Sequence, residues 1–454
     1  MFMPHFAKGM GGSIIKSPLD DDFYKFRMAV FVLTYFPDVH VTFKLIVRTK
    51  HLPLALIIRE DDLRLELDLA RECAFIDEKD PRYISEFEYL AGYIPEVVPH
   101  RQFFRSFKLP PYELKRVGDT YELSFSGRWA EVMFWEIKAL AIINELKSRA
   151  IAAHMTKNER AVYYARAKDR IYRDLVEIRD TTQISFLGFG LRRHESFWWE
   201  SFVTEMAQGV MGERFLGTST VSIAKRFGMP TSGTMAHELM MAAVALASSE
   251  SPEAMIHAQY DVLRKWEDLF SDGLIFLPDA YGTEQFFRNM PDDFARHVAH
   301  TWKGGRWDSG DVIEEGERHV AFFRKHGVDP WKAEKIGVPS DGLDVPLMQK
   351  LDRHFIQEKV IRLVCGWGTN FTNQFKGCHP RGDEQSVMWG NPVGLTWNEI
   401  CGGQSIVVKV DSVNGIPAAK LSNNPNKATG RADVVERDKK VFGVGVQEVQ
   451  DVLV

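Results

Sequence analysis

The segment HTWKGGRWDSGD, residues 300–311, contains the pattern that decides the fold. A short strand is expected to end near Arg306, and a run of polar and glycine residues follows it at once. Five other segments share this design: ISFLGFG (184–190), RFLGTST (214–220), GLIFLPDAYGT (273–283), EKIGVPSDGLD (334–344) and IRLVCGWGTN (361–370). Stretches with helical spacing fit between them, at 192–208, 235–249, 254–270, 284–297, 311–325 and 345–356. This repetition predicts an irregular β/α barrel, whose chemistry is carried by the loops at the carboxyl ends of the strands.

The region before the repeats has a different pattern. We expect helices over 20–36, 129–149 and 157–180, with helical spacing over 51–93. The alternation of VHVTFKLIVR, residues 39–48, predicts a strand, and 103–108 and 121–125 are interpreted as short strands. The last 20 or so residues, which include ERDKK at 436–440, are interpreted as a polar extension. A chain of 454 residues is too long for one ordinary core, so two or three domains are expected.

Composition excludes several classes of protein. The net charge is −5 and the basic residues do not cluster, which argues against a general nucleic-acid binder. The four cysteines form no C-x-x-C pair, so a zinc or redox motif is not expected. No signal peptide is evident, and no apolar run reaches the ~20 residues of a membrane span. We therefore expect a cytoplasmic protein that does not bind membranes.

Several strand-end residues suit a small anionic ligand. Arg192 and Arg193 follow a predicted strand, where an arginine can hold a carboxylate with two parallel hydrogen bonds; a surface salt bridge is the alternative. Tyr24 suits stacking on an aromatic ligand, although a tyrosine in the core is the commoner outcome.

The glycine-rich and aspartate-rich turns suit phosphates and sugar hydroxyls. Backbone N–H groups in Gly366-Trp367-Gly368-Thr369 and Gly217-Thr218-Ser219-Thr220 can converge on a phosphate, unless these are ordinary tight turns. Carboxylates in the segments 306–311 and 340–344 suit ribose hydroxyls or a magnesium-bound phosphate, and helix capping is the alternative.

His237 belongs to the segment Gly233-Thr234-Met235-Ala236-His237-Glu238. With Thr234 as the helix cap, His237 falls in the first helical turn, where the helix dipole favours a neutral, nucleophilic imidazole and attracts phosphate. A structural histidine remains the alternative.

In this order, the segments resemble the bacterial type of the nicotinate phosphoribosyltransferase family. The resemblance spans about residues 17–430. It rests on the opening Leu19-Asp20-x-Asp22-x-Tyr24-Lys25 with Phe36-Pro37-Asp38, on Trp135-Glu136-Ile137 through Asn144-Glu145, and on the six strand-end segments. It ends with Asn414-Gly415-Ile416-Pro417, Lys420-Leu421-Ser422 and Lys427. The sequence departs from the family at Leu191 and Thr220, and residues 370–373 have no clear counterpart.

The resemblance implies a type II phosphoribosyltransferase fold. It predicts an N-terminal α/β domain over 1–150, a barrel over 151–399, and C-terminal strands and tail over 400–454 that return to the first domain. The family is usually a homodimer whose subunits complete each other's active sites. The resemblance assigns Tyr24 to stacking on the pyridine ring, Arg192 to the nicotinate carboxylate, and His237 to phosphorylation by ATP. It assigns Arg306 and Asp308 to catalysis and gives, as further substrate-binding residues, Asp22, Leu191, Gly217, Ser219, Asp341, Asp344, Gly366, Gly368 and Thr369.

The implied reaction joins nicotinate to phosphoribosyl diphosphate and gives nicotinate mononucleotide and diphosphate, for NAD biosynthesis. The resemblance makes it an ATP-dependent, ligase-type reaction, with a phosphohistidine at His237 and magnesium on the substrate phosphates. A nicotinamide phosphoribosyltransferase and a non-catalytic nucleotide-binding barrel are the main alternatives. A quinolinate enzyme would be shorter, and an aldolase-like barrel would need a marked Schiff-base lysine.

Overall fold

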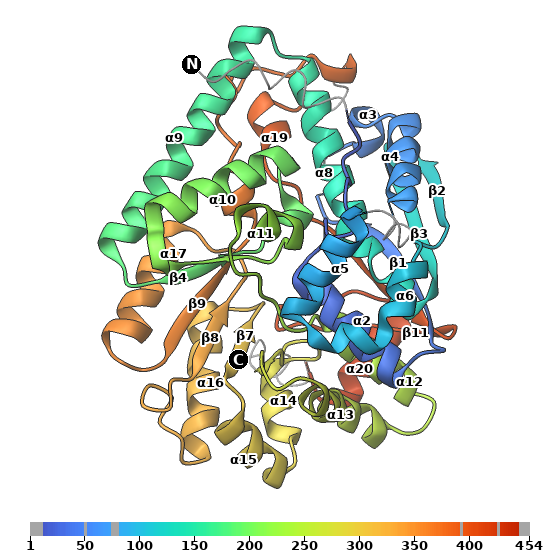
Figure 1. Cartoon of the computed structure of the whole chain (residues 1–454), viewed down its shortest axis with the longest axis vertical. Coiled ribbons are helices and arrows are strands. Elements are labelled where there is room, and N and C mark those ends of the chain that lie inside the picture. Colours follow the sequence, from blue (N-terminus) through green and yellow to red (C-terminus); the bar gives the residue numbers. More distant parts are fainter. Residues whose placement is uncertain (1–11, 50–51, 74–80, 391–393, 425–426, 445–454) are drawn as a thin grey trace, which may run out of the picture.

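Two β-sheets organise the molecule. The computed structural model describes residues 12–49, 52–73, 81–390, 394–424 and 427–444. In Figure 1 the antiparallel strands of one sheet (β1 to β3) lie on one side, and the parallel strands of the other (β7 to β9) lie on the opposite side. The mixed α/β fold expected from the sequence is confirmed.

The parallel sheet is the expected barrel. Its strands lie in the order β5-β4-β9-β8-β7-β6, and each neighbouring pair is parallel. They are β4 (Ser185–Gly188), β5 (Phe215–Thr218), β6 (Ile275–Phe276), β7 (Gly304–Trp307), β8 (Ile336–Pro339) and β9 (Arg362–Trp367). Each strand falls in one of the six segments quoted above. Among the described residues, β5 and β6 stay unpaired with each other, so the barrel is open between them.

Helices connect and cover these strands. They are α9 (Lys157–Thr181), α10 (Phe197–Met211), α11 (Val221–Phe227), α12 (His237–Ala247), α13 (Pro252–Leu269), α14 (Thr283–Asn289), α15 (Asp292–Thr301), α16 (Val312–Lys325), α17 (Val345–Leu351) and α18 (Thr369–Thr372). Short 3-10 turns η2 (Leu191–Arg193) and η3 (Gly212–Arg214) and the π-helical η4 (Asp352–Gln357) complete the set. The single helix expected over 284–297 is two helices, because Pro291 lacks an N–H and separates α14 from α15.

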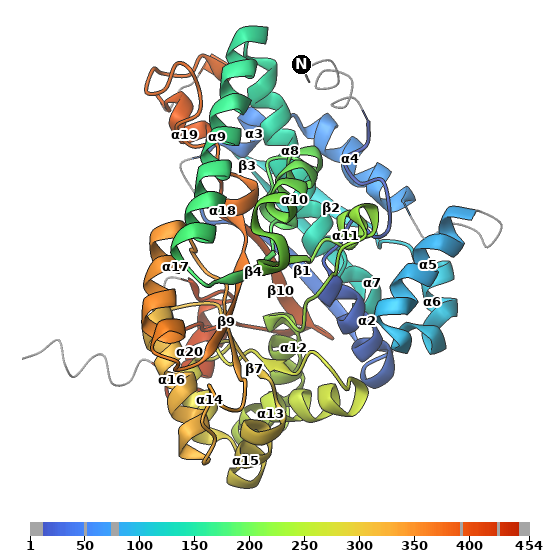
Figure 2. The same cartoon turned by 60° about the vertical axis from the view of Figure 1, so that its left-hand side comes forward.

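The antiparallel sheet combines both ends of the chain. Its order is β11-β10-β1-β3-β2, with β1 (His40–Val47), β2 (Tyr112–Val117), β3 (Thr120–Arg128), β10 (Ile406–Val413) and β11 (Ile416–Pro417). Strand β10 pairs with β1 from Val413 to Ile406, and Figure 2 shows the two side by side. The C-terminal segment therefore returns to the N-terminal sheet, as expected.

The remaining helices come from the N-terminal and C-terminal parts of the chain. They are α2 (Phe23–Tyr35), α3 (Leu54–Ile57), α4 (Glu60–Glu72), α5 (Pro81–Tyr93), η1 (Pro95–His100), α6 (Arg101–Ser106), α7 (Trp129–Val132), α8 (Trp135–Ala153), η5 (Met388–Gly390), α19 (Trp397–Cys401) and α20 (Ala432–Phe442). Helix α8 packs against β10 and against η2, and α12 also packs against β10. These contacts bring β10 to the carboxyl ends of the parallel strands.

Two sequence-based predictions of secondary structure are wrong. Most of the strand expected over 103–108 is helix α6, because Phe104 and Phe107 have near-helical spacing and both are buried. The expected polar extension contains α20, which buries Val434, Asp438 and Phe442 at intervals of four residues. The Phe442 ring stacks on Tyr281 with centroids 4.3 Å apart. Residues 445–454 lie outside the described part of the chain.

Two other expectations concern domains and membranes. The domain limits at residues 150 and 399 remain predictions; helix α8 runs to Ala153, and residue 399 lies inside α19. Within the described ranges, no helix is long and apolar enough to cross a membrane.

Candidate active site

Two adjoining cavities lie where the barrel meets β10. The first, of about 260 Å³, takes its aliphatic lining from strands, and we call it the apolar cavity. The second, of about 290 Å³, is lined mainly by loops that follow the strands, and we call it the cationic cavity. Both cavities are lined by Tyr24, Phe189, Arg192 and Arg306, so these four residues mark the junction.

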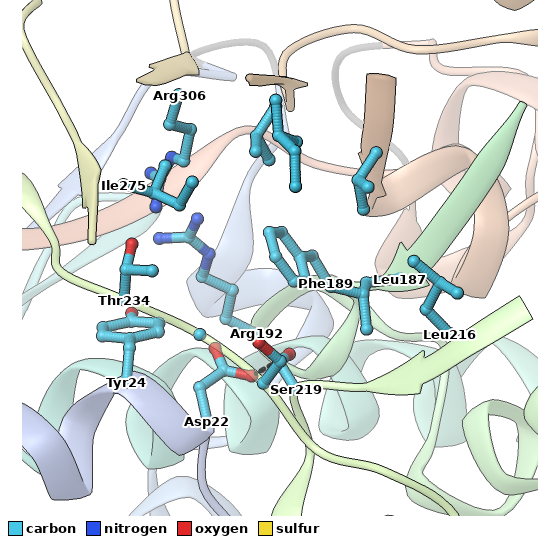
Figure 3. A pocket seen from close by; sticks show the side chains of 15 residues that line it. Asp22, Tyr24, Leu187, Phe189, Arg192, Leu216, Ser219, Thr234, Ile275 and Arg306 are labelled. Atoms are coloured by element: carbon cyan, nitrogen blue, oxygen red, sulfur yellow. Dashed lines mark hydrogen bonds between the residues drawn. The ribbon is translucent and has the colours of Figure 1, made fainter. Parts of the chain in front are cut away.

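The apolar cavity lies within the open barrel. Six aliphatic side chains from β4, β5, β6, β8 and β9 line it: Leu187, Leu216, Ile275, Ile336, Val338 and Val364. A β/α barrel normally fills its interior with such side chains. Here they leave room beside the junction, and Figure 3 shows Leu187 and Leu216 at the end away from Tyr24 and Thr234.

The junction combines an aromatic ring with a cation. In Figure 3 the Arg192 guanidinium extends into the space beside Tyr24, Thr234 and Arg306. The guanidinium Nη1 of Arg192 lies 3.7 Å from Glu136 Oε1, which is too long for a hydrogen bond. The guanidinium thus has charge compensation nearby and N–H groups that can pair with a planar carboxylate.

Asp22 adds an ionisable group to the wall of the apolar cavity. Burial raises the pKa of Asp22 to about 7, although a hydrogen bond from the Ser219 hydroxyl, 2.6 Å long, opposes the shift. The Asp22 side chain therefore changes from neutral to negative as the pH rises through about 7.

The cationic cavity concentrates positive charge. Its lining contains two aspartates, Asp308 and Asp341, and seven basic side chains: Arg48, Arg192, Arg193, Arg306, Lys409, Lys420 and Lys427. Burial lowers the pKa of Lys409 to about 8, with Glu136 opposing the shift. Burial and the neighbouring Arg192 lower the pKa of Arg193 to about 10. Such an excess of cationic side chains favours a ligand with several negative charges.

His237 stands in the wall of the cationic cavity as the first residue of α12. Its Nε2 lies 2.7 Å from Asp279 Oδ1, and its Nδ1 lies 3.7 Å from Asp308 Oδ2. Burial lowers the pKa of His237 to about 4, so the imidazole is neutral at neutral pH. With the Nε2 proton donated to Asp279, the lone pair of Nδ1 is available as a nucleophile.

Asp308 is held beside this imidazole by two neighbours. Arg306 Nη2 lies 3.0 Å from Asp308 Oδ2, and the Ser340 hydroxyl donates to Asp308 Oδ1 at 2.9 Å. Burial opposes ionisation, yet Arg306 and His237 keep the pKa of Asp308 well below its usual range. One ligand atom from each of His237, Asp279 and Asp308 lies within 4.8 Å of the others, a spacing that a divalent cation could occupy.

Comparisons with known proteins identify the fold and its family. Residues 184–446 match the model of the "Nicotinate phosphoribosyltransferase (NAPRTase) family", and residues 19–144 match that of its N-terminal domain. The chain belongs to the nicotinate phosphoribosyltransferase family.

Solved structures agree with this membership. The structure of nicotinate phosphoribosyltransferase from Vibrio cholerae has 26% identity and a TM-score of 0.78, with 97% of each chain covered. A Saccharomyces cerevisiae structure that carries the same activity name has 25% identity and a TM-score of 0.77, with 96% of this chain and 99% of that chain covered. A Porphyromonas gingivalis structure, at 23% identity with a TM-score of 0.74 and coverage of 95% and 100%, shares the fold. The family predicted from the ordered motifs is confirmed.

The structure brings most of the predicted site residues of this family member together. Tyr24, Arg192 and Arg306 line both cavities, Asp22 and Ser219 line the apolar cavity, and His237, Asp308, Asp341, Gly368 and Thr369 line the cationic cavity. Tyr24 and Arg192 of one chain line the same two cavities.

Four predicted residues line neither cavity. Leu191 is fully buried. Gly217 has φ +110° and no room for a side chain, because a Cβ would meet the carbonyl oxygen of Pro230. A Cβ on Gly366 would collide with the Phe189 ring. Asp344 caps α17 by accepting a hydrogen bond from Leu347 N, the alternative that the sequence left open.

The start of α12 differs from expectation. The residue before α12 is Ala236, which makes no side-chain cap, and Thr234 lines the apolar cavity instead. Asp311 caps α16, which leaves Asp308 free to face the cavity. Of the positions where the sequence departs from the family, Thr220 donates to Glu200 at 2.6 Å, and Asn370 lines the cationic cavity.

Sequence reasoning missed several residues of the site. Asp279 directly follows the expected strand in the segment 273–283, and this position could have revealed it. Lys409 alternates with apolar residues in β10 and resembles an ordinary solvent-facing lysine, so no local signal marks it. Arg48, Lys420 and Lys427 also line the cationic cavity without having been assigned a role.

Proposed function

We propose that this protein converts nicotinate and 5-phosphoribosyl 1-diphosphate to nicotinate mononucleotide and diphosphate, with ATP hydrolysed through a phosphohistidine at His237. It would act as a cytoplasmic, ATP-dependent, ligase-type enzyme of NAD biosynthesis. The observation that carries the proposal is the position of Arg192 beside Tyr24, at the junction of an apolar and a cationic cavity. An aromatic ring with one carboxylate suits the junction, and a polyphosphate suits the cationic side.

Nicotinate would bind at the junction through its carboxylate and its ring. The Arg192 guanidinium would pair with the carboxylate in two parallel hydrogen bonds. The Tyr24 and Phe189 rings would contact the pyridine faces, with the ring nitrogen directed at the cationic cavity. This nitrogen already has a lone pair, so no general base is needed for its attack on the ribose.

Phosphoribosyl diphosphate would occupy the cationic cavity. The bond from the anomeric carbon to the diphosphate breaks as the bond to the pyridine nitrogen forms, and positive charge develops on the ribose. The basic side chains of the cavity would stabilise the leaving diphosphate, and the Asp308 carboxylate would face the cationic sugar or its hydroxyls. Magnesium on the substrate phosphates would add charge neutralisation, with Asp308 and Asp279 as the oxygen ligands that suit it.

ATP would be used at His237. Its Nδ1 would form a bond to the γ-phosphorus as the bond to the ADP oxygen breaks, and Asp279 would keep the proton on Nε2 and stabilise the resulting imidazolium. Hydrolysis of the phosphohistidine after ribosyl transfer would return the enzyme to its first state.

Assembly is part of the proposal. The family resemblance predicts a homodimer with shared active sites. The two subunits would complete each other's active sites, and in each chain Tyr24 and Arg192 line the same cavity.

A product assay tests the function. Purified protein is given phosphoribosyl diphosphate and magnesium with either nicotinate or nicotinamide, each with and without ATP, and the mononucleotides are separated and quantified. We expect nicotinate mononucleotide to dominate and ATP to increase its rate. Preferential turnover of nicotinamide would favour the nicotinamide phosphoribosyltransferase alternative, and no product from either substrate would favour a non-catalytic barrel.

A further inference from the structure

A buried lysine connects two parts of the site without lining either cavity. Lys25 of α2 is fully buried, and its Nζ lies 2.7 Å from Glu136 Oε2 of α8 and 2.6 Å from Glu238 Oε2 of α12. Two carboxylates from different helices therefore share one ammonium group.

Glu136 connects Lys25 to the anion-binding residues. Its second oxygen, Oε1, lies 3.2 Å from Lys409 Nζ and 3.7 Å from Arg192 Nη1. Glu136 is 2% exposed, and burial alone would raise its pKa, but Lys25, Lys409 and Arg192 together hold that pKa well below its usual range. One carboxylate thus sets the charge environment of two basic groups in the cationic cavity.

The Glu238 end reaches the phosphorylation site. Glu238 directly follows His237 in the first turn of α12, and its other oxygen accepts a hydrogen bond from Trp129 Nε1 at 2.7 Å. Trp129 anchors this carboxylate from a third helix, so a movement of the start of α12 must change the Glu238–Lys25 contact.

We propose that Lys25 is a positioning residue that transmits the phosphorylation state of His237 to Arg192 and Lys409 through the contacts Glu238–Lys25–Glu136. This inference rests on the proposed ATP-dependent function. It assigns a role to three charged residues that contact no substrate.

The direction of the effect follows from competition for one ammonium group. Phosphorylation adds about two negative charges at His237. The neighbouring Asp308 pairs with Arg306, and the neighbouring Asp279 pairs with Lys420. We expect the added charge to change these contacts and to shift the start of α12. If Glu238 moves away, Lys25 keeps its contact with Glu136, no longer shares its charge with Glu238, and neutralises more of the charge of Glu136. Glu136 then holds Arg192 less, and the guanidinium is freer to pair with nicotinate. ATP should therefore lower the KM for nicotinate.

A double substitution cuts this connection without leaving an unpaired buried charge. Lys25→Met alone would leave Glu136 and Glu238 facing each other, which endangers folding. The variant Lys25→Met with Glu238→Met removes one cation and one anion, and such a replacement of a buried ion pair by apolar side chains is often neutral for stability. Lys409 and Arg192 keep their contacts with Glu136. A matched control is Lys147→Met. Lys147 is also a buried lysine, but it lies in α8 and donates to the carbonyl of Gly402.

The measurements are the KM for nicotinate with and without ATP, and the acid-labile phosphate that ATP leaves on the protein. We expect the double variant to keep its ATP-independent rate within about threefold of wild type and to keep the phosphate label. Its KM for nicotinate should no longer respond to ATP, whereas Lys147→Met should respond like the wild type. The response expected in wild type is about tenfold, the effect of a coupling of ~1.4 kcal/mol.

Three results would overturn the proposal. A double variant that still responds fully to ATP shows that the signal takes another route. A loss of rate, label and ATP response by one common factor shows a purely structural role. If the wild-type KM for nicotinate does not respond to ATP, this inference and the proposed ATP-dependent step both fail. Nicotinate mononucleotide formed in the same assay would still show that the protein is a transferase.

Discussion

The two cavities of the active site are built by different means. The aliphatic lining of the apolar cavity comes from β4, β5, β6, β8 and β9, and every one of those side chains belongs to a strand or its immediate flank. The cationic cavity takes its side chains from loops after the strands, from β10, and from the segment that contains Lys420 and Lys427. The strands of one sheet thus supply the shape of the apolar cavity, and loops and β10 supply the charge of the cationic cavity.

This difference predicts different responses to substitution. An apolar wall acts through its shape, so loss of a few atoms changes binding by a modest amount. A cluster of cations in a cavity acts through charge, and removal of one member leaves the charge of the ligand uncompensated. The residues at the junction should have the largest effects, because they serve both cavities.

The largest effect is expected for Arg192→Ala. Truncation of one partner in a buried charge pair costs about 2–5 kcal/mol, which corresponds to at least about a thirtyfold loss in kcat/KM for nicotinate. Steady-state kinetics with saturating phosphoribosyl diphosphate measure the loss, and circular dichroism checks the fold. Arg193→Ala is the matched control, since Arg193 lines only the cationic cavity and should affect phosphoribosyl diphosphate instead. Near-wild-type kcat/KM in a folded Arg192→Ala variant would disprove the carboxylate role.

The next effect concerns His237→Ala, which should abolish ATP hydrolysis and leave a slow transferase that ignores ATP. The neutral imidazole, held by Asp279, is the nucleophile of the proposed phosphorylation, and ribosyl transfer does not require it chemically. Phosphate release from ATP and mononucleotide formation are measured in parallel, with a loss of about tenfold or more in the ATP-supported transfer rate. If ATP still stimulates the folded variant, the phosphohistidine hypothesis is wrong.

Local patterns predicted much of this architecture. The six strand segments, the strand over 39–48 and the main helices all have periodicities that report burial directly. The same segments contain Arg306, Asp308 and Gly368, because loops at the carboxyl ends of parallel strands meet in space. The family resemblance added Tyr24 and Arg192, whose side chains have plausible structural roles when considered alone.

The remaining features depend on contacts between distant segments. Lys409 becomes a site residue only because β10 pairs with β1 and packs on α8 and α12. Lys25 has no motif of its own, and its importance depends on two acids more than 100 residues apart, Glu136 and Glu238. Helix α20 looked like a polar tail, since the partner of its buried Phe442 is Tyr281 of another segment. Local sequence patterns do not reveal contacts with such distant segments.

A smaller effect is expected for Lys427→Met in the cationic cavity. Lys427 contacts Asp341, and its loss should raise the KM for phosphoribosyl diphosphate about tenfold, since a hydrogen bond to a charged group contributes ~1.5–3 kcal/mol. The KM for nicotinate should stay within about twofold. Lys439→Met is the control, because Lys439 pairs with Glu436 on the surface of α20. Equal changes in both KM values would contradict the separation of the two cavities.

The smallest effect is the pH dependence that Asp22 gives to the apolar cavity. Its pKa is raised to about 7, so the carboxyl is mostly neutral below pH 7 and becomes an anion above it. Nicotinate brings its own negative charge to Arg192, close to this group, and therefore binds best when Asp22 is protonated. Binding then takes up a proton, and the KM for nicotinate should rise severalfold between pH 7 and pH 8.

The substitution Asp22→Asn isolates this titration from the others in the reaction. The asparagine carbonyl can still accept the hydrogen bond from Ser219, and its charge does not change with pH. With saturating phosphoribosyl diphosphate, its KM for nicotinate should stay flat from pH 6 to about pH 8, while the wild type rises. The free energy of unfolding should also depend on the protonation of Asp22. Because the pKa of this carboxyl is higher in the folded state than in the unfolded state, Asp22 favours folding at acidic pH, and this contribution is lost between about pH 4 and pH 7. Thermal unfolding of Asp22→Asn should therefore be less sensitive to pH in this range than that of the wild type. A KM that rises equally in both proteins would assign the pH dependence to another group.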